Sequence, residues 1–200
     1  MSIDVLARAQ SAEETARKEF LHRKLHEIQN AHASWVSHNF GEQNEQHPFY
    51  GMVEETGELF HALLKLSQGI RVNEHHGEKI PDAIGDILIY MMNVCSLQKL
   101  RMSDLWPGLH VEPVFVGRRP LLRMVFYLGQ IAGYFASGGR DTAQPGDRAM
   151  LVHALRAFLA TLEAFCVEND MDMLAVLCET WAVVKKRDWT KNRETGKAPA

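Results

Sequence analysis

Apolar residues recur along this chain at helical spacing, whereas runs that alternate apolar and polar residues are nearly absent. This pattern predicts six helices, at about residues 11–39, 48–68, 81–101, 120–136, 148–168 and 171–187. One short stretch, Val114–Val116, has a strand-like composition. We therefore predict an all-α fold, a bundle of about six helices that forms a single domain over residues 1–200, with its core in residues 12–101.

Residues at the ends of these segments indicate where the helices begin and end. Ser11 and Glu14 have the spacing of a capping box, Pro81 suits a first helical turn, and Gly69 suits a helix stop. Residues 103–119 contain several Pro and Gly residues and predict an irregular connector. The polar segment 191–200 predicts a disordered tail.

Composition and charge narrow the class of protein. Hydrophobic residues make up 46% of the chain and charged residues 24%, as in an ordinary globular domain. The formal net charge is -3 and the longest basic run is Lys185-Lys186-Arg187, so we expect no nucleic-acid partner. No apolar run approaches the roughly 18 residues of a membrane span, and the N-terminus does not resemble a signal peptide. We expect a cytoplasmic protein without a membrane partner.

Cysteine and histidine residues do not by themselves predict a metal centre. His22 and His26 have a spacing that suits zinc, but no further ligand clusters with them, which favours a solvated or packed pair. His75 and His76 fall in a charged loop and are expected to be solvated. The cysteines lie in apolar helical contexts and predict buried free thiols; they are Cys95, Cys166 and Cys178.

A weak internal similarity links two predicted helices. Gly57-Glu58-Leu59 corresponds to Gly129-Gln130-Ile131 at an offset of 72, and Cys95 corresponds to Cys166 at an offset of 71. One interpretation is chance similarity between amphipathic helices. The other is a duplicated helical hairpin whose degenerate second copy covers residues 120–168 and has lost its acidic residues.

The helix at residues 48–68 carries three carboxylates on about one face. Glu55 and Glu58 are three residues apart, and Glu54 and Glu58 are four apart. A solvated acidic face explains these glutamates as simply as a binding site does.

The helix at residues 81–101 is apolar nearly all round and is therefore expected to be buried. Asp82 and Asp86 are four residues apart, and Tyr90 and Asn93 continue the same stripe. We expect these polar side chains to face a common polar cavity. Simpler alternatives are that Asp82 caps the helix at its positive end and that Tyr90 is a packed aromatic residue.

Carboxylates grouped in a partly buried setting are unfavourable unless a cation neutralises them. Lys65, Lys79 and Lys99 lie on these two helices but off the acidic stripe. Clusters that offer only oxygen ligands suit hard cations, Mg²⁺ first and Mn²⁺ second. The two acidic segments together predict a metal site, and a metal held by carboxylates suits phosphate chemistry.

The order of these residues resembles a known family. The chain contains Glu-Glu-x-Gly-Glu-Leu, then a loop, then Asp-x-x-Gly-Asp followed by three apolar residues and Tyr. This order is similar to that of the all-α nucleoside triphosphate pyrophosphohydrolases, the MazG-like superfamily that also holds the dimeric dUTPases. The family signature is ExxE, a spacer, and ExxD. Glu55 and Glu58 match its first half, and Asp86 matches its final Asp. The resemblance covers about residues 20–101, with a further similar segment at Val184–Trp189.

The resemblance implies a four-helix core and Mg²⁺-dependent hydrolysis of an NTP or dNTP to the monophosphate and pyrophosphate. The expected catalytic residues are Glu54, Glu55, Glu58 and Asp86. The expected metal ligands are Glu55, Glu58, Asp82 and Asp86. The expected substrate contacts are Tyr90, Asn93, Lys186 and Arg187. Alternatively, the basic residues complement a helix C-terminus, and Trp35 and Trp189 either stack on a base or pack in the core.

The chain departs from the family pattern at Ala83, where the third acidic residue is expected. Asp82 or Glu54 supplies the missing carboxylate, or the protein is a catalytically degenerate relative that binds a nucleotide or a protein partner without turnover. The family usually completes its site by dimerising, so we expect a homodimer. If the internal similarity is a duplication, we expect instead a pseudo-dimeric monomer in which helices 120–136 and 148–168 replace the partner.

Overall fold

The computed structural model describes residues 3–106 and 120–197, and every regular element in those ranges is helical. The α-helices are α1 (Ile3–Phe40), α2 (His47–Gln68), α3 (His76–Leu97), α4 (Pro120–Ala136), α5 (Gly139–Thr142), α6 (Pro145–Glu168) and α7 (Met173–Val184). Two 3-10 turns, η1 (Val72–Glu74) and η2 (Met102–Asp104), lie in connections. The predicted all-α fold is confirmed. Val114–Val116 and most of the predicted connector lie outside the described residues.

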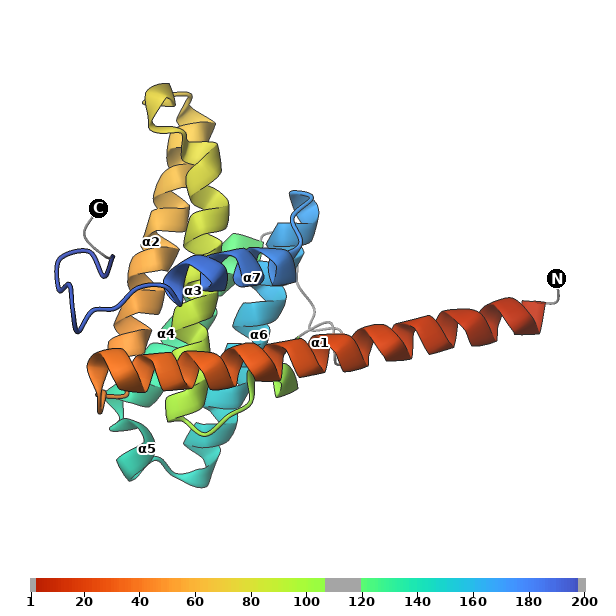
Figure 1. Cartoon of the computed structure of the whole chain (residues 1–200), viewed down its shortest axis with the longest axis horizontal. Coiled ribbons are helices and arrows are strands. Elements are labelled where there is room, and N and C mark those ends of the chain that lie inside the picture. The colour runs from red at the N-terminus through yellow and green to blue at the C-terminus, as the bar shows by residue number, and fades with distance from the viewer. Residues whose placement is uncertain (1–2, 107–119, 198–200) are drawn as a thin grey trace.

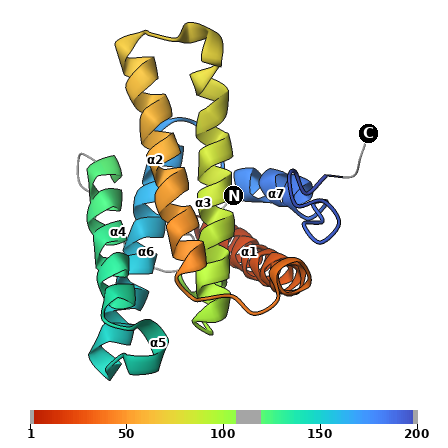
Figure 2. The ribbon, with the colours of Figure 1, turned by 90° about the vertical axis from the view of Figure 1, so that its left-hand side faces the viewer.

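The helices form two hairpins crossed by two further helices. α2 and α3 make one hairpin, and α4 and α6 make a second beside it (Figure 2). α1 and α7 cross on the other side of α3, and the first half of α1 projects beyond the rest of the molecule (Figure 1). α3 is therefore the central element and contacts α1, α2 and α7.

Burial of α3 follows from its composition. Ile84, Ile87, Leu88 and Met91 are all 0% exposed and belong to one continuous core that also contains residues of α6 and α7. The sequence-based expectation of a buried third helix is thus confirmed.

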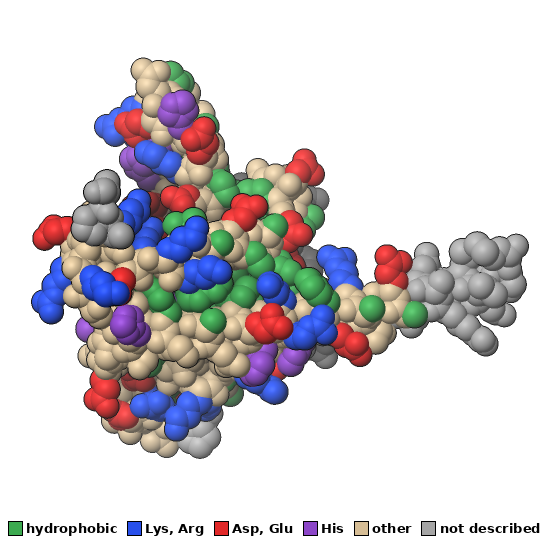
Figure 3. All heavy atoms as spheres, in the orientation of Figure 1, with side chains coloured by type: hydrophobic (Ala, Val, Ile, Leu, Met, Phe, Trp, Pro, Cys, Tyr) green, Lys and Arg blue, Asp and Glu red, His purple; other side chains and the backbone are tan. Residues whose placement is uncertain are grey.

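The described part of the chain has two helical segments whose length and composition alone would allow them to cross a membrane. They are α3 and the stretch Gly146–Glu168 of α6. This differs from the expectation that no apolar segment reaches that length. In this fold 61% of each window is buried against other helices, as is usual for core helices of a bundle. Apolar side chains also reach the surface where α7 runs beside α1 (Figure 3).

Helix ends agree with the sequence signals in part. Gly69 ends α2 in the left-handed conformation with φ 63°, and its N–H bonds the carbonyl of Leu66. α3 begins at His76 rather than at Pro81, because a proline inside the second turn removes only one helical hydrogen bond and the upstream residues continue the helix. Ser11 lies within α1 and not at its start.

The described chain beyond α7 is a hydrogen-bonded loop beside α1, and the disordered tail predicted for residues 191–200 stays a prediction. The N–H of Asp188 donates to the carbonyl of Gly196 at 2.6 Å, and the Asn192 side chain donates to the carbonyl of Lys197 at 2.9 Å. The N–H of Trp189 donates to Asn39 Oδ1 at 2.7 Å. Residues 198–200 lie outside the described part.

The two hairpins are the segments that the internal similarity compares. α2–α3 and α4–α6 are the most closely packed helix pairs in the described structure. Duplication and chance similarity both predict this pairing, so the duplication stays an interpretation.

Candidate functional site

Two cavities meet at Asp86 and Arg187, which line both of them. The first, which we name the charged cavity, has a volume of about 550 Å³ and lies between α3 and α7. The second, the aromatic cavity, has a volume of about 480 Å³ and is bordered by α1, the start of α2, α3 and the C-terminal segment. Each volume falls in the usual range for small-molecule sites.

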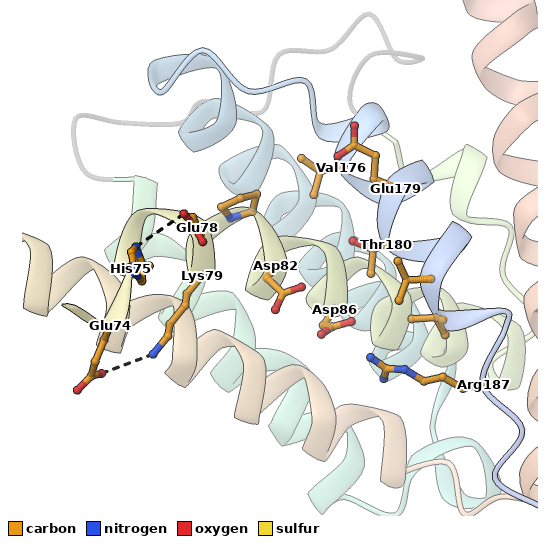
Figure 4. Close-up of a pocket in the computed structure, with 13 residues that line it drawn as sticks. Glu74, His75, Glu78, Lys79, Asp82, Asp86, Val176, Glu179, Thr180 and Arg187 are labelled. Carbon is orange, nitrogen blue, oxygen red and sulfur yellow. Dashed lines mark hydrogen bonds and ion pairs between the residues drawn. The ribbon is translucent and has the colours of Figure 1, made fainter. Parts of the chain in front are cut away.

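The charged cavity is built from one face of α3 and the facing side of α7. Figure 4 shows Asp82 and Asp86 on the same side of α3, with Arg187 approaching Asp86 from beyond the end of α7. The two helices approach closely because Gly85 has no side chain; a Cβ there would overlap the hydroxyl of Thr180. This close approach brings the C-terminal end of α7, and Arg187 after it, beside Asp86.

The aromatic cavity has rings on several sides and a carboxylate from α2. Its rings belong to His32, Trp35, Phe40, His47, Tyr90 and Trp189. Glu55 faces this cavity and is half-buried. The Tyr90 ring lies directly against the backbone of α2 at Gly51, where a Cβ would clash with it. Asn93 Nδ2 donates to Gln43 Oε1 at 2.7 Å, which joins α3 to the α1–α2 connection.

His32 is a buried polar group at the edge of the aromatic cavity. It is 1% exposed, its ring lies 5.5 Å from that of Trp181, and its Nδ1 is buried without a hydrogen-bond partner. Burial lowers the pKa of His32 to about 4, so the ring is neutral at physiological pH. Its Nδ1 is therefore a hydrogen-bonding group that no described residue satisfies and that the fold covers.

The carboxylates of α2 and α3 shift one another's pKa. Burial, and then the charges of Asp86, Glu58, Glu54 and Asp82, raise the pKa of Glu55 to about 7. Burial and Asp82 raise the pKa of Asp86 to about 6, and Arg187 opposes this shift. Such mutual shifts require the carboxylates to lie close together in a setting poor in water.

The structure brings together most of the predicted site residues, but in two cavities rather than one. Asp82 and Asp86 share the charged cavity. The aromatic cavity holds Glu55, Asp86, Tyr90, Asn93 and Arg187. Glu54 and Glu58 are exposed on α2 and line neither cavity, although both contribute to the raised pKa of Glu55. Lys186 is exposed and lines neither cavity.

Position 83 differs in environment from its neighbour. Ala83 is 4% exposed and packs in the core, whereas Asp82 is exposed to the charged cavity. In the described part of the chain, α4 and α6 contribute no residue to either cavity. α7 and the C-terminal segment border the cavities instead, and the expectation of a homodimer or a pseudo-dimeric monomer stays a prediction.

The donor set fits a hard cation in type. The predicted ligands offer only carboxylate oxygens, as Mg²⁺ prefers. Their mutual repulsion, seen in the raised pKa of Glu55 and of Asp86, is what a bound cation would relieve. Within residues 3–106 and 120–197, no three His, Cys, Asp or Glu side chains already lie close enough together to hold one ion, so metal binding here requires side-chain adjustment.

No protein-family model, curated protein or solved structure matches this chain. The resemblance to pyrophosphohydrolases therefore rests on the residues of the two acidic segments.

Sequence reasoning missed several residues that border the two cavities. His32 falls on the apolar stripe of α1, four residues after Ile28, and that position was a signal of burial. Thr180 gave no signal, because its role depends on the contact between α3 and α7.

Proposed function

We propose that this protein is a Mg²⁺-dependent nucleoside triphosphate pyrophosphohydrolase of the MazG-like type, which converts an NTP or dNTP to the monophosphate and pyrophosphate. The observation that carries the proposal is the position of Asp86. It lies where an aromatic cavity large enough for a nucleoside meets a second cavity lined by carboxylates, with Arg187 beside it.

The aromatic cavity suits the nucleoside. Rings of Trp35, Tyr90 and Trp189 offer flat surfaces on which a base can stack, and stacking contributes about 1–3 kcal/mol per base in other nucleotide sites. His32 Nδ1 has no partner, and a turn of its ring toward the cavity would offer it to a base edge or a sugar hydroxyl. With the nucleoside there, the phosphates extend toward Asp86 and Arg187.

The carboxylates suit the reacting phosphates. Glu55, Asp82 and Asp86 would hold Mg²⁺ together with Glu58, which would turn in from the exposed face of α2. The ion would neutralise charge on the phosphate oxygens. A carboxylate of the cluster that the ion leaves free would accept the proton of the attacking water. Arg187 offers a charged fork for phosphate oxygens. Asp82 supplies the carboxylate that Ala83 lacks, because Asp82 faces the charged cavity while Ala83 is buried in the core.

The test is a product assay on the purified protein. Each NTP and dNTP is incubated with Mg²⁺ and with EDTA, and the products are separated as nucleoside monophosphate plus pyrophosphate or diphosphate plus phosphate. We expect the first pair, with Mg²⁺ required. Glu55→Gln and Asp86→Asn should each lower kcat by at least a hundredfold, whereas Glu27→Gln, an exposed substitution on α1, should leave it unchanged.

The result that would overturn the proposal is the absence of pyrophosphate from every nucleotide, or turnover that survives Asp86→Asn. A Mg²⁺-dependent rise in melting temperature with a nucleotide, in the absence of turnover, would instead identify the degenerate nucleotide-binding protein.

A further inference from the structure

His76 is a buried histidine for which the described structure provides no hydrogen-bond partner. It is the first residue of α3 and is 3% exposed, and both of its ring nitrogens are buried without a hydrogen bond. An unpaired buried polar group costs about 1–3 kcal/mol, so its presence requires an explanation. His76 was expected to be solvated because it falls in a charged segment, and it is buried instead.

Two other metal-ligating side chains lie next to His76, at the tip of the α2–α3 hairpin. The ring of His61, on α2, has its centroid 6.1 Å from that of His76. Glu74 Oε2, from η1, lies 3.9 Å from His76 Nε2. Histidine and acidic side chains gather at this tip in the space-filling view (Figure 3).

The spacing is close to that of a tetrahedral metal site. With bonds of about 2 Å, two ligand atoms on one tetrahedral ion lie about 3.3 Å apart, and two imidazole centroids about 5 Å apart. The observed separations of 3.9 Å and 6.1 Å are each longer by about 1 Å or less. His61 is exposed and free to change rotamer, whereas burial fixes His76. The ligands therefore reach one ion by movement of His61 and Glu74.

We propose that His61, His76 and Glu74 bind a transition-metal ion of the Zn²⁺ class, with water in the fourth position. Two imidazoles and one carboxylate are a zinc-type set, and imidazole ligands disfavour Mg²⁺. The ion joins the C-terminal half of α2 to the start of α3. It thereby fixes a turn in which Arg71 and His75 both have a left-handed backbone, with φ of 55° and 50°.

Glu74 also has basic neighbours, which set the strength of the site. Lys79 Nζ lies 3.5 Å from Glu74 Oε2, and an Arg71 guanidinium nitrogen lies 3.6 Å from Glu74 Oε1. Both basic side chains are at least half exposed, so they can turn away into water when an ion takes the carboxylate. Glu74 also lines the charged cavity, so this site adjoins Asp82 and Asp86. Its two imidazole ligands lie outside that cavity, and the proposal does not depend on the proposed function.

The experiment is a titration of EDTA-treated protein with Zn²⁺, followed by calorimetry and by melting temperature, with Co²⁺ used to report ligand geometry by its visible absorption. We expect one site per chain, a tetrahedral Co²⁺ spectrum, and a rise in melting temperature. His61→Ala and Glu74→Gln should each weaken binding at least tenfold. His22→Ala is the matched control, because His22 and His26 are exposed and have a helical spacing that suits zinc, and it should leave the affinity unchanged.

His76→Asn adds a third variant, whose helix content is first compared with that of the parent protein by circular dichroism. His61→Ala and Glu74→Gln change exposed or half-exposed side chains. These two variants therefore test whether the proposed ligands bind Zn²⁺ even if His76→Asn folds poorly. Unchanged Zn²⁺ affinity in His61→Ala would overturn the proposal. So would displacement of Zn²⁺ by millimolar Mg²⁺, which would place the ion among the carboxylates, or a failure of the parent protein to bind Zn²⁺.

Discussion

The indole N–H of Trp35 donates a hydrogen bond of 2.9 Å to the carbonyl oxygen of Arg187, a residue 152 positions later in the chain. One turn further along α1, Asn39 accepts the N–H of Trp189 at 2.7 Å and donates to the Trp35 carbonyl at 2.9 Å. The first helix therefore fixes the backbone that carries Arg187 and Trp189 into the aromatic cavity.

Replacing Trp35 with phenylalanine should loosen the C-terminal segment without emptying the cavity wall. We expect a loss of about 1 kcal/mol in the free energy of unfolding, because one hydrogen bond to the backbone is removed. The backbone amides around Trp189 should exchange hydrogen faster, since their anchor on α1 is weakened. If the proposed function holds, the KM for the nucleotide should rise several-fold with a smaller change in kcat.

Trp181→Phe is the matched control for Trp35→Phe. Trp181 belongs to the same aromatic cluster, with its ring 6.2 Å from that of Trp35, but does not contact the Arg187 carbonyl. It should leave amide exchange near Trp189 unchanged. Equal effects of the two substitutions would show that cluster packing, and not the hydrogen bond, holds the segment.

His32 should make the protein sensitive to acid. Its pKa is about 4 in the folded protein and near 6.5 when unfolded, so the unfolded chain binds a proton first as the pH falls. The stability that neutral His32 contributes is complete above about pH 6.5 and is lost as the pH falls toward 4, by up to about 3 kcal/mol. Urea unfolding at a series of pH values should show a smaller loss over this interval in His32→Phe.

His26→Asn, an exposed substitution on the same helix, should retain the pH dependence of the parent protein. A pH dependence in His32→Phe equal to that of the parent would assign the acid sensitivity to other groups.

The carboxylates of the site should act in the opposite direction in metal-free protein. The folded pKa values of Glu55 and Asp86, about 7 and about 6, are raised above their ordinary values near 4.5 and 3.8. A raised carboxyl pKa favours folding below the unfolded pKa, and this contribution is lost as the pH rises through the folded pKa. In EDTA, these groups should therefore lower the free energy of unfolding as the pH rises from about 4 to about 7.

Mg²⁺ should reverse this loss if it binds where we propose. Glu55→Gln in EDTA should raise the melting temperature at pH 8, because an unfavourable charge is removed, and should reduce the stabilisation by Mg²⁺. Glu27→Gln should do neither. Full Mg²⁺ stabilisation in both Glu55→Gln and Asp86→Asn would place the cation elsewhere.

The sequence predicted the fold class and the central helix because both depend on local periodicity. The apolar positions of α3 repeat so densely that only burial suits them, and the four-residue spacing of Asp82 and Asp86 places them on one face without any knowledge of the fold. Gly69 ends α2 where predicted because a left-handed residue is a local requirement.

The division of the site into two cavities was not predictable, since it depends on contacts between distant segments. Arg187 reaches Asp86 because α7 packs on α3, and Trp189 is held by Asn39 across 150 residues. The burial of His76 likewise follows from the fold of the hairpin tip, whereas its charged neighbours in sequence indicated exposure.

Gly85 should be among the positions of α3 least tolerant of a side chain. A Cβ there would overlap the Thr180 hydroxyl, so Gly85→Ala forces α7 and α3 apart at the charged cavity. We expect a loss of about 1–3 kcal/mol in the free energy of unfolding, although alanine is the better helix former by about 1 kcal/mol. In Gly129→Ala, on α4, a Cβ meets nothing within 4 Å, so the same change should stabilise the protein. Adding Thr180→Ala to Gly85→Ala should recover part of the loss, and strict additivity in the double-mutant cycle would contradict the close contact.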